Sequence, residues 1–206
     1  MTADDLFATL AVVVVLTGVG IAVAAMKRSG QKRFESLAPA FDFGTSHKVG
    51  LFGMTIAGLA EGYTCRYTIQ PASQHNPGGA SLRVSVSAGG RWSAEVANTG
   101  SRLLVKVGVL QDVEIGDPEL ELKLRFSADD PGALKSLFGI ESVRAAIRDT
   151  LATENFSSVR LGRKGLEVRW SPRSKQLDED ADILGRRLAT TTTFASACGY
   201  PPQLSF

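Results

Sequence analysis

The sequence predicts an α+β fold in which one N-terminal transmembrane helix is followed by a mostly antiparallel β-sheet domain with about three covering helices. An uncharged apolar run near the N-terminus indicates the first part. Beyond it, several segments alternate apolar and polar residues, and later segments repeat apolar residues every three or four positions. We therefore expect two regions, an anchor with a basic flank over residues 1–33 and an α+β domain over residues 34–206.

The apolar run extends from Leu6 to Met26 and follows Asp4 and Asp5. At roughly 1.5 Å per residue, such a helix covers the ~30 Å hydrocarbon core of a bilayer. The alternative is a cleaved secretory signal, because Ala22 and Ala24 form an A-x-A string. A signal peptide has a basic leader and a shorter apolar stretch, so the pattern favours an uncleaved anchor.

The residues flanking the apolar run predict its orientation. Lys27, Arg28, Lys32 and Arg33 all follow the run, and basic residues beside a span stay on the cytoplasmic side. We expect the short N-terminus outside and the domain in the cytoplasm of a bacterial inner membrane. The same four residues are the predicted membrane-surface contacts, because they attract anionic lipid headgroups.

Small residues in the apolar run suggest a helix partner. Gly18 and Ala22, and likewise Gly20 and Ala24, lie four positions apart, which lets another helix approach closely. These four are the predicted helix-packing residues, and integral membrane protein subunits are the expected partners. Small residues also occur in spans that have no partner, so that alternative stays open.

The predicted cytoplasmic region carries no net charge. Four of the 23 basic residues and two of the 21 acidic residues precede residue 34, which leaves nineteen of each beyond it. A nucleic-acid binder normally has a basic excess that displaces counterions. The balance therefore argues against a nucleic-acid partner.

Alternation with period two predicts one-sided strands in four segments, Tyr63–Ile69, Leu82–Val86, Leu120–Phe126 and Leu166–Trp170. Gly162 to Gly165 predicts a hairpin turn that follows a strand near Phe156–Leu161.

The predicted helices lie late in the chain. Asp130 is placed to cap a helix that starts at Pro131, and an apolar stripe follows from Ile140 to Leu151. A final stripe runs from Leu177 to Leu188. The apolar stretch from Phe194 to Phe206 is interpreted as an irregular tail that packs on its own domain or on a neighbour.

One segment resembles the most recognisable stretch of a group of uncharacterised bacterial membrane-anchored proteins. It runs from Ile115 to Leu120 and continues through Arg125–Pro131 to Val143 and Arg144. That group shares a domain of unknown function, in which a G-D-P turn leads into a strand and then a D-D-P helix start. The resemblance implies the architecture only, because no catalytic residues are attached to the group.

No set of residues predicts an enzyme. Asp117 and Asp130 each precede Pro, in a turn or at a helix start, where an Asp side chain commonly stabilises the backbone. We therefore interpret Asp117, Asp129 and Asp130 as structural residues rather than catalytic or metal-binding ones. His47 and His75 are expected in solvated loops, with no second ligand at metal spacing. Cys65 and Cys198 form no metal or redox pattern and are interpreted as buried thiols. We expect no catalytic residue, cofactor or metal.

Charge is segregated along the predicted domain. Asp112, Glu114, Asp117, Glu119 and Glu121 form an acidic stretch, whereas Arg160, Arg163, Lys164, Arg169, Arg173 and Lys175 form a basic one. These stretches either face each other as solvated strand edges or offer docking patches to partner subunits. The candidate docking residues are Arg160, Arg163, Lys164, Arg169, Arg173, Tyr200 and Phe206.

The sequence therefore suggests a non-catalytic, single-pass accessory subunit that stabilises a larger bacterial inner-membrane complex, of the respiratory or photosynthetic kind, from its cytoplasmic face. The alternative is a membrane-tethered module that binds or senses a small ligand or lipid. A concave apolar pocket would favour the alternative, and a flat charged surface would favour the accessory subunit.

Overall fold

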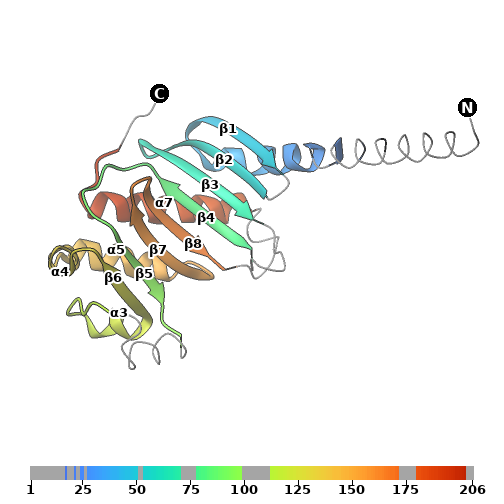
Figure 1. Ribbon diagram of the computed structural model, residues 1–206. Coiled ribbons are helices and arrows are strands. Elements are labelled where there is room, and N and C mark those ends of the chain that lie inside the picture. The colour runs from blue at the N-terminus through green and yellow to red at the C-terminus, as the bar shows by residue number, and fades with distance from the viewer. Residues whose placement is uncertain are drawn as a thin grey trace, which may run out of the picture.

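The protein is an eight-stranded antiparallel sheet with helices packed on one face (Figure 1). The computed structural model describes residues 17, 21, 24–25, 27–50, 53–70, 78–98, 112–171 and 180–202. The α+β fold class and the antiparallel sheet are thus as predicted.

The strands occur in the order β1-β2-β3-β4-β8-β7-β5-β6 across the sheet. The first four form a meander, and β7 and β8 form a hairpin that lies between β4 and β5. Their bounds are β1 Phe43–Gly50, β2 Gly53–Ala60, β3 Tyr63–Gln70, β4 Gly79–Val84, β5 Trp92–Val96, β6 Leu124–Ala128, β7 Phe156–Gly162 and β8 Gly165–Trp170.

A helix over residues 27–37 runs into the short 3-10 helix η1 and packs beside β1. The other helices are η1 Ala38–Ala40, α3 Pro118–Lys123, α4 Pro131–Phe138, α5 Glu141–Leu151 and α7 Ala181–Ala197. In Figure 1, α5, α7 and the helix over residues 27–37 lie behind the sheet, α3 and α4 lie beside β6, and no described helix covers the opposite face, which we call the open face.

The core lies between the inner face of the sheet and the helices. The rings of Trp92, Phe126, Phe138 and Phe194 form a chain of edge-to-face contacts with centroids 5.0–6.0 Å apart. These aromatic contacts connect β5 and β6 to α4 and α7, and such pairs stabilise a core beyond their buried area.

Several sequence predictions are confirmed. Alternate residues of β3, β4 and β8 are buried, and Gly162 pairs with Gly165 at the hairpin turn. Gly165 has φ +113°, and a Cβ there would clash with the Val84 carbonyl, so only glycine fits. Asp130 caps α4 as predicted.

The predicted strand over Leu120–Phe126 is wrong in its first half. Residues 118–123 form helix α3, capped by Asp117, and only Leu124 begins strand β6. Leu122 is 64 % exposed, although the alternating pattern placed it on the buried face. The Asp-Pro cap signal at residues 117–118 therefore dominates over the alternation that follows it.

The predicted irregular tail also begins too early. Helix α7 continues to Ala197, with Phe194 and Ala195 fully buried. The residues that start the predicted stripe, Leu177 to Glu179, lie outside the described residues, and Asp180 caps the helix.

Most of the predicted anchor, including Gly18, Gly20 and Ala22, also lies outside the described residues. Within the part that the structure describes, no helix combines the length and apolar character needed to cross a bilayer. Of the predicted helix-packing residues only Ala24 is described, and it is helical and exposed.

Candidate functional site

The four predicted membrane-surface residues lie on the helix over residues 27–37, which is docked onto the sheet edge. Phe34 stacks on His47 of β1 with the ring centroids 4.2 Å apart, and Leu37 is fully buried. Gly30 is buried against Val49, and a Cβ at Gly30 would overlap that side chain. A stripe of positions 30, 34 and 37 thus joins the helix to the domain.

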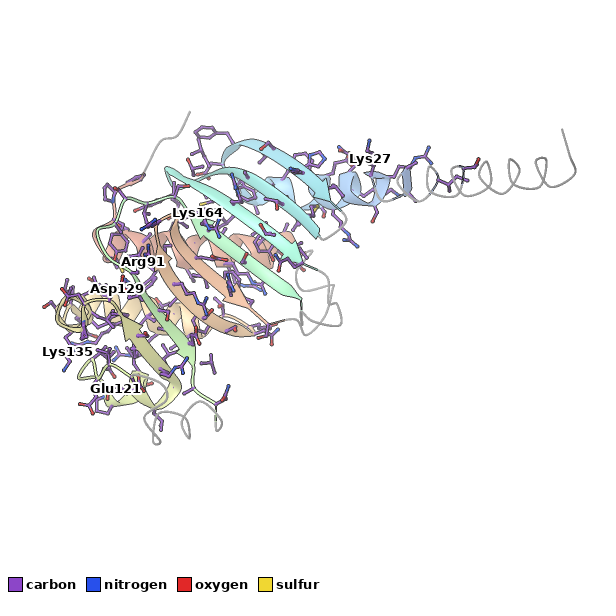
Figure 2. All side chains as sticks on the ribbon, in the orientation of Figure 1. Lys27, Arg91, Glu121, Asp129, Lys135 and Lys164 are labelled. Carbon is purple, nitrogen blue, oxygen red and sulfur yellow. The ribbon has the colours of Figure 1, made fainter. Side chains whose placement is uncertain are left out.

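The basic side chains lie around this stripe. Lys27, Arg28 and Lys32 are exposed, whereas Arg33 is half-buried. Lys27 marks the helix in Figure 2. The helix crosses the predicted boundary between residues 33 and 34 without interruption, so the basic flank is part of the folded unit.

The open face of the sheet carries a strong excess of positive charge. Every Lys, Arg and Glu side chain of the eight described strands belongs to the register rows that face away from the helices. They are six cations and two anions: Lys48, Arg66, Arg83, Arg125, Arg160 and Arg169, with Glu95 and Glu167. We call this set the open-face charges.

The two glutamates are each shared between two arginines. Glu167 accepts hydrogen bonds from Arg83 Nη2 at 2.9 Å and from Arg169 Nε at 3.1 Å. Glu95 accepts from Arg125 Nη2 at 3.0 Å and from Arg160 Nη2 at 2.5 Å. Each arginine–glutamate–arginine group therefore keeps a net charge of +1. The hydrogen bonds and charges of Arg83 and Arg169 hold the pKa of the Glu167 carboxyl below its usual range, although burial opposes this.

Arg66 adds a charge with no ion-pair partner among the described residues. It is exposed on β3 and lies directly opposite Arg83 of β4 in the sheet register. Like charges opposite each other destabilise an antiparallel pair.

The predicted docking residues are only partly brought together. Arg160 and Arg169 belong to the open face, and Arg163 and Lys164 are exposed at the β7–β8 turn (Lys164 in Figure 2). Arg173 and Phe206 lie outside the described residues.

Tyr200, another predicted docking residue, is used within its own domain. Its carbonyl accepts from the Tyr63 hydroxyl at 3.0 Å, and its hydroxyl accepts from Trp92 Nε1 at 3.3 Å. Burial raises the pKa of the Tyr200 hydroxyl. These two hydrogen bonds join the segment that follows α7 to β3 and β5.

Among the described residues, the predicted acidic stretch forms no ion pair with the predicted basic one. Glu121 accepts from the backbone N–H groups of Ile115 and Gly116, and Asp112 accepts from that of Phe126. These carboxylates fix the segment that covers the outer edge of β6.

Asp117 and Asp130 have the structural roles that the sequence suggested. Both side chains cap helices, Asp117 at the N–H groups of Glu119 and Leu120, and Asp130 at that of Ala133. Asp117 also accepts from Arg148 Nη2 of α5 at 2.6 Å. Among the described residues, no group of three or more His, Cys, Asp or Glu side chains could hold a metal ion.

Both cysteines are free thiols, Cys65 fully buried and Cys198 half-buried. Burial raises the pKa of each thiol to about 12, so both stay protonated near neutral pH. His47 lies on strand β1 rather than in the loop that the sequence suggested, because β1 extends across residues 43–50.

Sequence reasoning missed a buried arginine. Arg187 of α7 is 2 % exposed, donates from Nη1 to the Tyr67 hydroxyl at 2.7 Å, and lies over the Trp170 ring with Cζ 4.6 Å from its centroid. Its position in the sequence, beside the exposed Arg186 on a helix, gave no signal of burial. It links α7 to β3 and β8 through the core.

Described residues form several surface hollows, of which two bear on a ligand site. One, of about 600 Å³, lies at the end of β4 and β8 beside Glu167, Arg169 and Ser81. The other, of about 500 Å³, lies between α5 and α7 beside Thr153, Ile183 and Arg186.

Comparisons with known proteins assign no family to this chain. No protein-family model matches it, and neither a curated protein nor a solved structure matches it.

Proposed function

We propose that the protein is a non-catalytic, single-pass accessory subunit that stabilises a larger bacterial inner-membrane complex, respiratory or photosynthetic, from its cytoplasmic face. In this proposal residues 6–26 span the membrane with the N-terminus outside. The domain then lies next to the membrane surface and braces neighbouring subunits.

The docked helix over residues 27–37 is the observation that supports this proposal. Gly30, Phe34 and Leu37 pack against the domain, so no flexible linker separates the basic flank from the sheet. A span continuous with this helix would hold the domain at a fixed height and orientation, as a brace requires. A long flexible tether would instead suit a domain that searches for its ligand.

Native purification tests the proposal directly. The full chain is extracted from membranes in mild detergent, and co-purifying proteins are identified by mass spectrometry at low and high salt. We expect defined membrane subunits in constant ratio to the chain. Recovery as a lone monomer in every detergent and at every salt concentration would overturn the proposal.

A matched pair of variants tests the anchor. Gly18→Leu with Ala22→Leu should weaken retention in the complex, because larger side chains keep a neighbouring helix away. Val12→Phe with Val19→Phe adds comparable bulk elsewhere in the run and should leave retention unchanged. Equal retention of both variants would remove the helix-packing argument.

Topology is tested by relocating Lys27, Arg28, Lys32 and Arg33 to the N-terminal side of the run. Protease protection of the domain should then invert or become mixed. Unchanged protection would show that orientation depends on another feature.

The alternative function, a membrane-tethered ligand-binding or lipid-binding module, is favoured by the hollow between α5 and α7, which combines Ile183 and Ala189 with Arg186. Substituting Ala189→Trp would place a large ring in this hollow and obstruct it. A lipid or ligand that co-purifies with the wild type and not with the Ala189→Trp variant would support the alternative. The absence of any co-purifying lipid or ligand from the wild type would count against it.

A further inference from the structure

We propose that the open face of the sheet docks an acidic segment of a neighbouring protein subunit. This inference depends on the proposed accessory function and names the surface and the chemistry of the partner. The open-face charges, six cations and two anions, carry it.

The open-face charges stand out within residues 34–206. That region carries equal numbers of basic and acidic residues, so a net charge of +4 on the open face is balanced by a net charge of −4 elsewhere in the same region. The docked helix adds four further cations, Lys27, Arg28, Lys32 and Arg33, at the edge of the sheet. A positive face of this kind favours encounter with an acidic partner.

The arginine–glutamate–arginine groups leave donors free for a partner. An arginine has five N–H donors in a planar fork that matches a carboxylate. Arg160 and Arg169 remain 48 % exposed although each is bonded to a glutamate. Four strand steps separate β4 from β6, roughly 19 Å at ~4.8 Å per step. An extended segment of about six residues spans this distance and places alternate carboxylates over the two groups.

Nucleic acid fits this face less well than protein. Single-stranded nucleic acid binds sheets by stacking bases on exposed aromatic rings. Among the described strands, the Phe, Tyr and Trp side chains of β3, β5, β6, β7 and β8 are buried on the helix side, and only Phe43, at the start of the edge strand β1, is exposed. A single exposed ring at the edge of the sheet offers no row of stacking partners. The glutamates at the centre of both groups would also repel a continuous phosphate backbone.

A bilayer also fits less well. Figure 1 shows the helix over residues 27–37 running alongside the sheet rather than across its open face. With a span at the N-terminal end of that helix, the membrane lies beyond the edge of the sheet. The open face then points sideways, toward a protein that stands beside this subunit.

The test uses the full chain in nanodiscs of zwitterionic lipid and three probes at equal concentration. The probes are a fluorescein-labelled peptide of ten glutamates, a labelled ten-residue oligouridylate, and vesicles containing phosphatidylserine. The variant set Arg66→Gln, Arg160→Gln and Arg169→Gln removes three open-face charges. The control set Lys123→Gln, Lys135→Gln and Arg144→Gln removes three charges from α3, α4 and α5, outside the open face (Lys135 in Figure 2).

We expect the glutamate peptide to bind more tightly than the oligouridylate, and the open-face variant to bind it about tenfold more weakly. The control set should stay within about twofold of the wild type. Equal loss in both sets would overturn the proposal. So would tighter binding of the oligouridylate, or vesicle binding that the open-face variant alone loses.

Co-purification from membranes separates this inference from the accessory function. If the wild type carries partner subunits and the open-face variant keeps them all, the docking surface is refuted and the accessory function stands. If the wild type is a lone monomer, the accessory function fails, and the peptide titration still decides whether the face binds acidic segments. Thermal unfolding of both variants establishes that each set is folded.

Discussion

Asp117 and Asp130 both cap helices, and only Asp117 also forms an ion pair, with Arg148. Replacing each aspartate in turn therefore provides a controlled test of the structure. Asp117 and Asp130 have nearly the same backbone angles, φ −123° and ψ 96° against φ −125° and ψ 100°, and each is followed by Pro. Asp130 is exposed and acts as a cap only. Asp117 is 7 % exposed and also binds Arg148.

The expected loss of stability follows from these contacts. Asp130→Ala removes one cap and should lower the free energy of unfolding by about 1 kcal/mol. Asp117→Ala removes the cap and leaves the buried Leu120 N–H without an acceptor. It also breaks the Arg148 ion pair. This adds about 1 kcal/mol to the loss of stability and no more, because the Arg148 side chain is 37 % exposed and solvent screens the pair. The total should be about 2–3 kcal/mol. Asp117→Asn keeps the cap and should lose only the ion-pair part.

The assay is urea unfolding of the full chain in one detergent, followed by circular dichroism, with the dependence on urea concentration compared between variants. Arg148→Met, alone and combined with Asp117→Asn, measures the coupling between the two side chains. Equal losses for Asp117→Ala and Asp130→Ala would refute the reasoning. A coupling energy near zero would show that the close contact contributes no stability.

Three further predictions concern other parts of the molecule. Gly30→Leu should release the basic helix from Val49 and lower the free energy of unfolding by about 1–3 kcal/mol, measured by urea unfolding, with faster hydrogen exchange in β1; unchanged exchange would contradict the docking. Gly185→Ala is the matched glycine control, since a Cβ there meets nothing within 4 Å, and it should raise the free energy of unfolding by up to about 1 kcal/mol. The Cys65 thiol holds its proton to about pH 12 when folded and ionises near pH 8.5 when unfolded. The unfolded state therefore binds fewer protons above pH 8.5, and the free energy of unfolding should fall by about 1.4 kcal/mol per pH unit for each of the two thiols, Cys65 and Cys198, up to about pH 12; Cys65→Ala should remove the part of the slope that belongs to Cys65, about half, and an identical pH profile would refute the burial effect.

Local patterns predicted many elements because each depends on residues near one another in the chain. The alternation in β3, β4 and β8 and the Asp130 cap were read correctly for this reason. Helix α3 was missed although its signal was present. Asp117-Pro118 followed by Glu119 matches the start of α4 in cap and Pro, but the alternating leucines after it were given more weight.

The candidate site could be predicted only in part. The sequence placed Arg66, Arg83 and Arg169 on the polar sides of their strands, which the structure confirms. It did not predict that cations from six strands meet on one face, nor that Glu95 joins them. Which strands become neighbours depends on long-range pairing, and the insertion of the β7–β8 hairpin between β4 and β5 has no local signature.

The sequence by itself determined the alternating strands, the Asp-Pro caps and the glycine hairpin, because sterics and hydrogen bonding over a few residues decide them. Only the tertiary structure decided that Gly30 fits against Val49, that Arg187 is enclosed by Tyr67 and Trp170, and that the open face is positive. These features require contacts between segments far apart in the chain, and the packing of the complete sheet against its helices selects them.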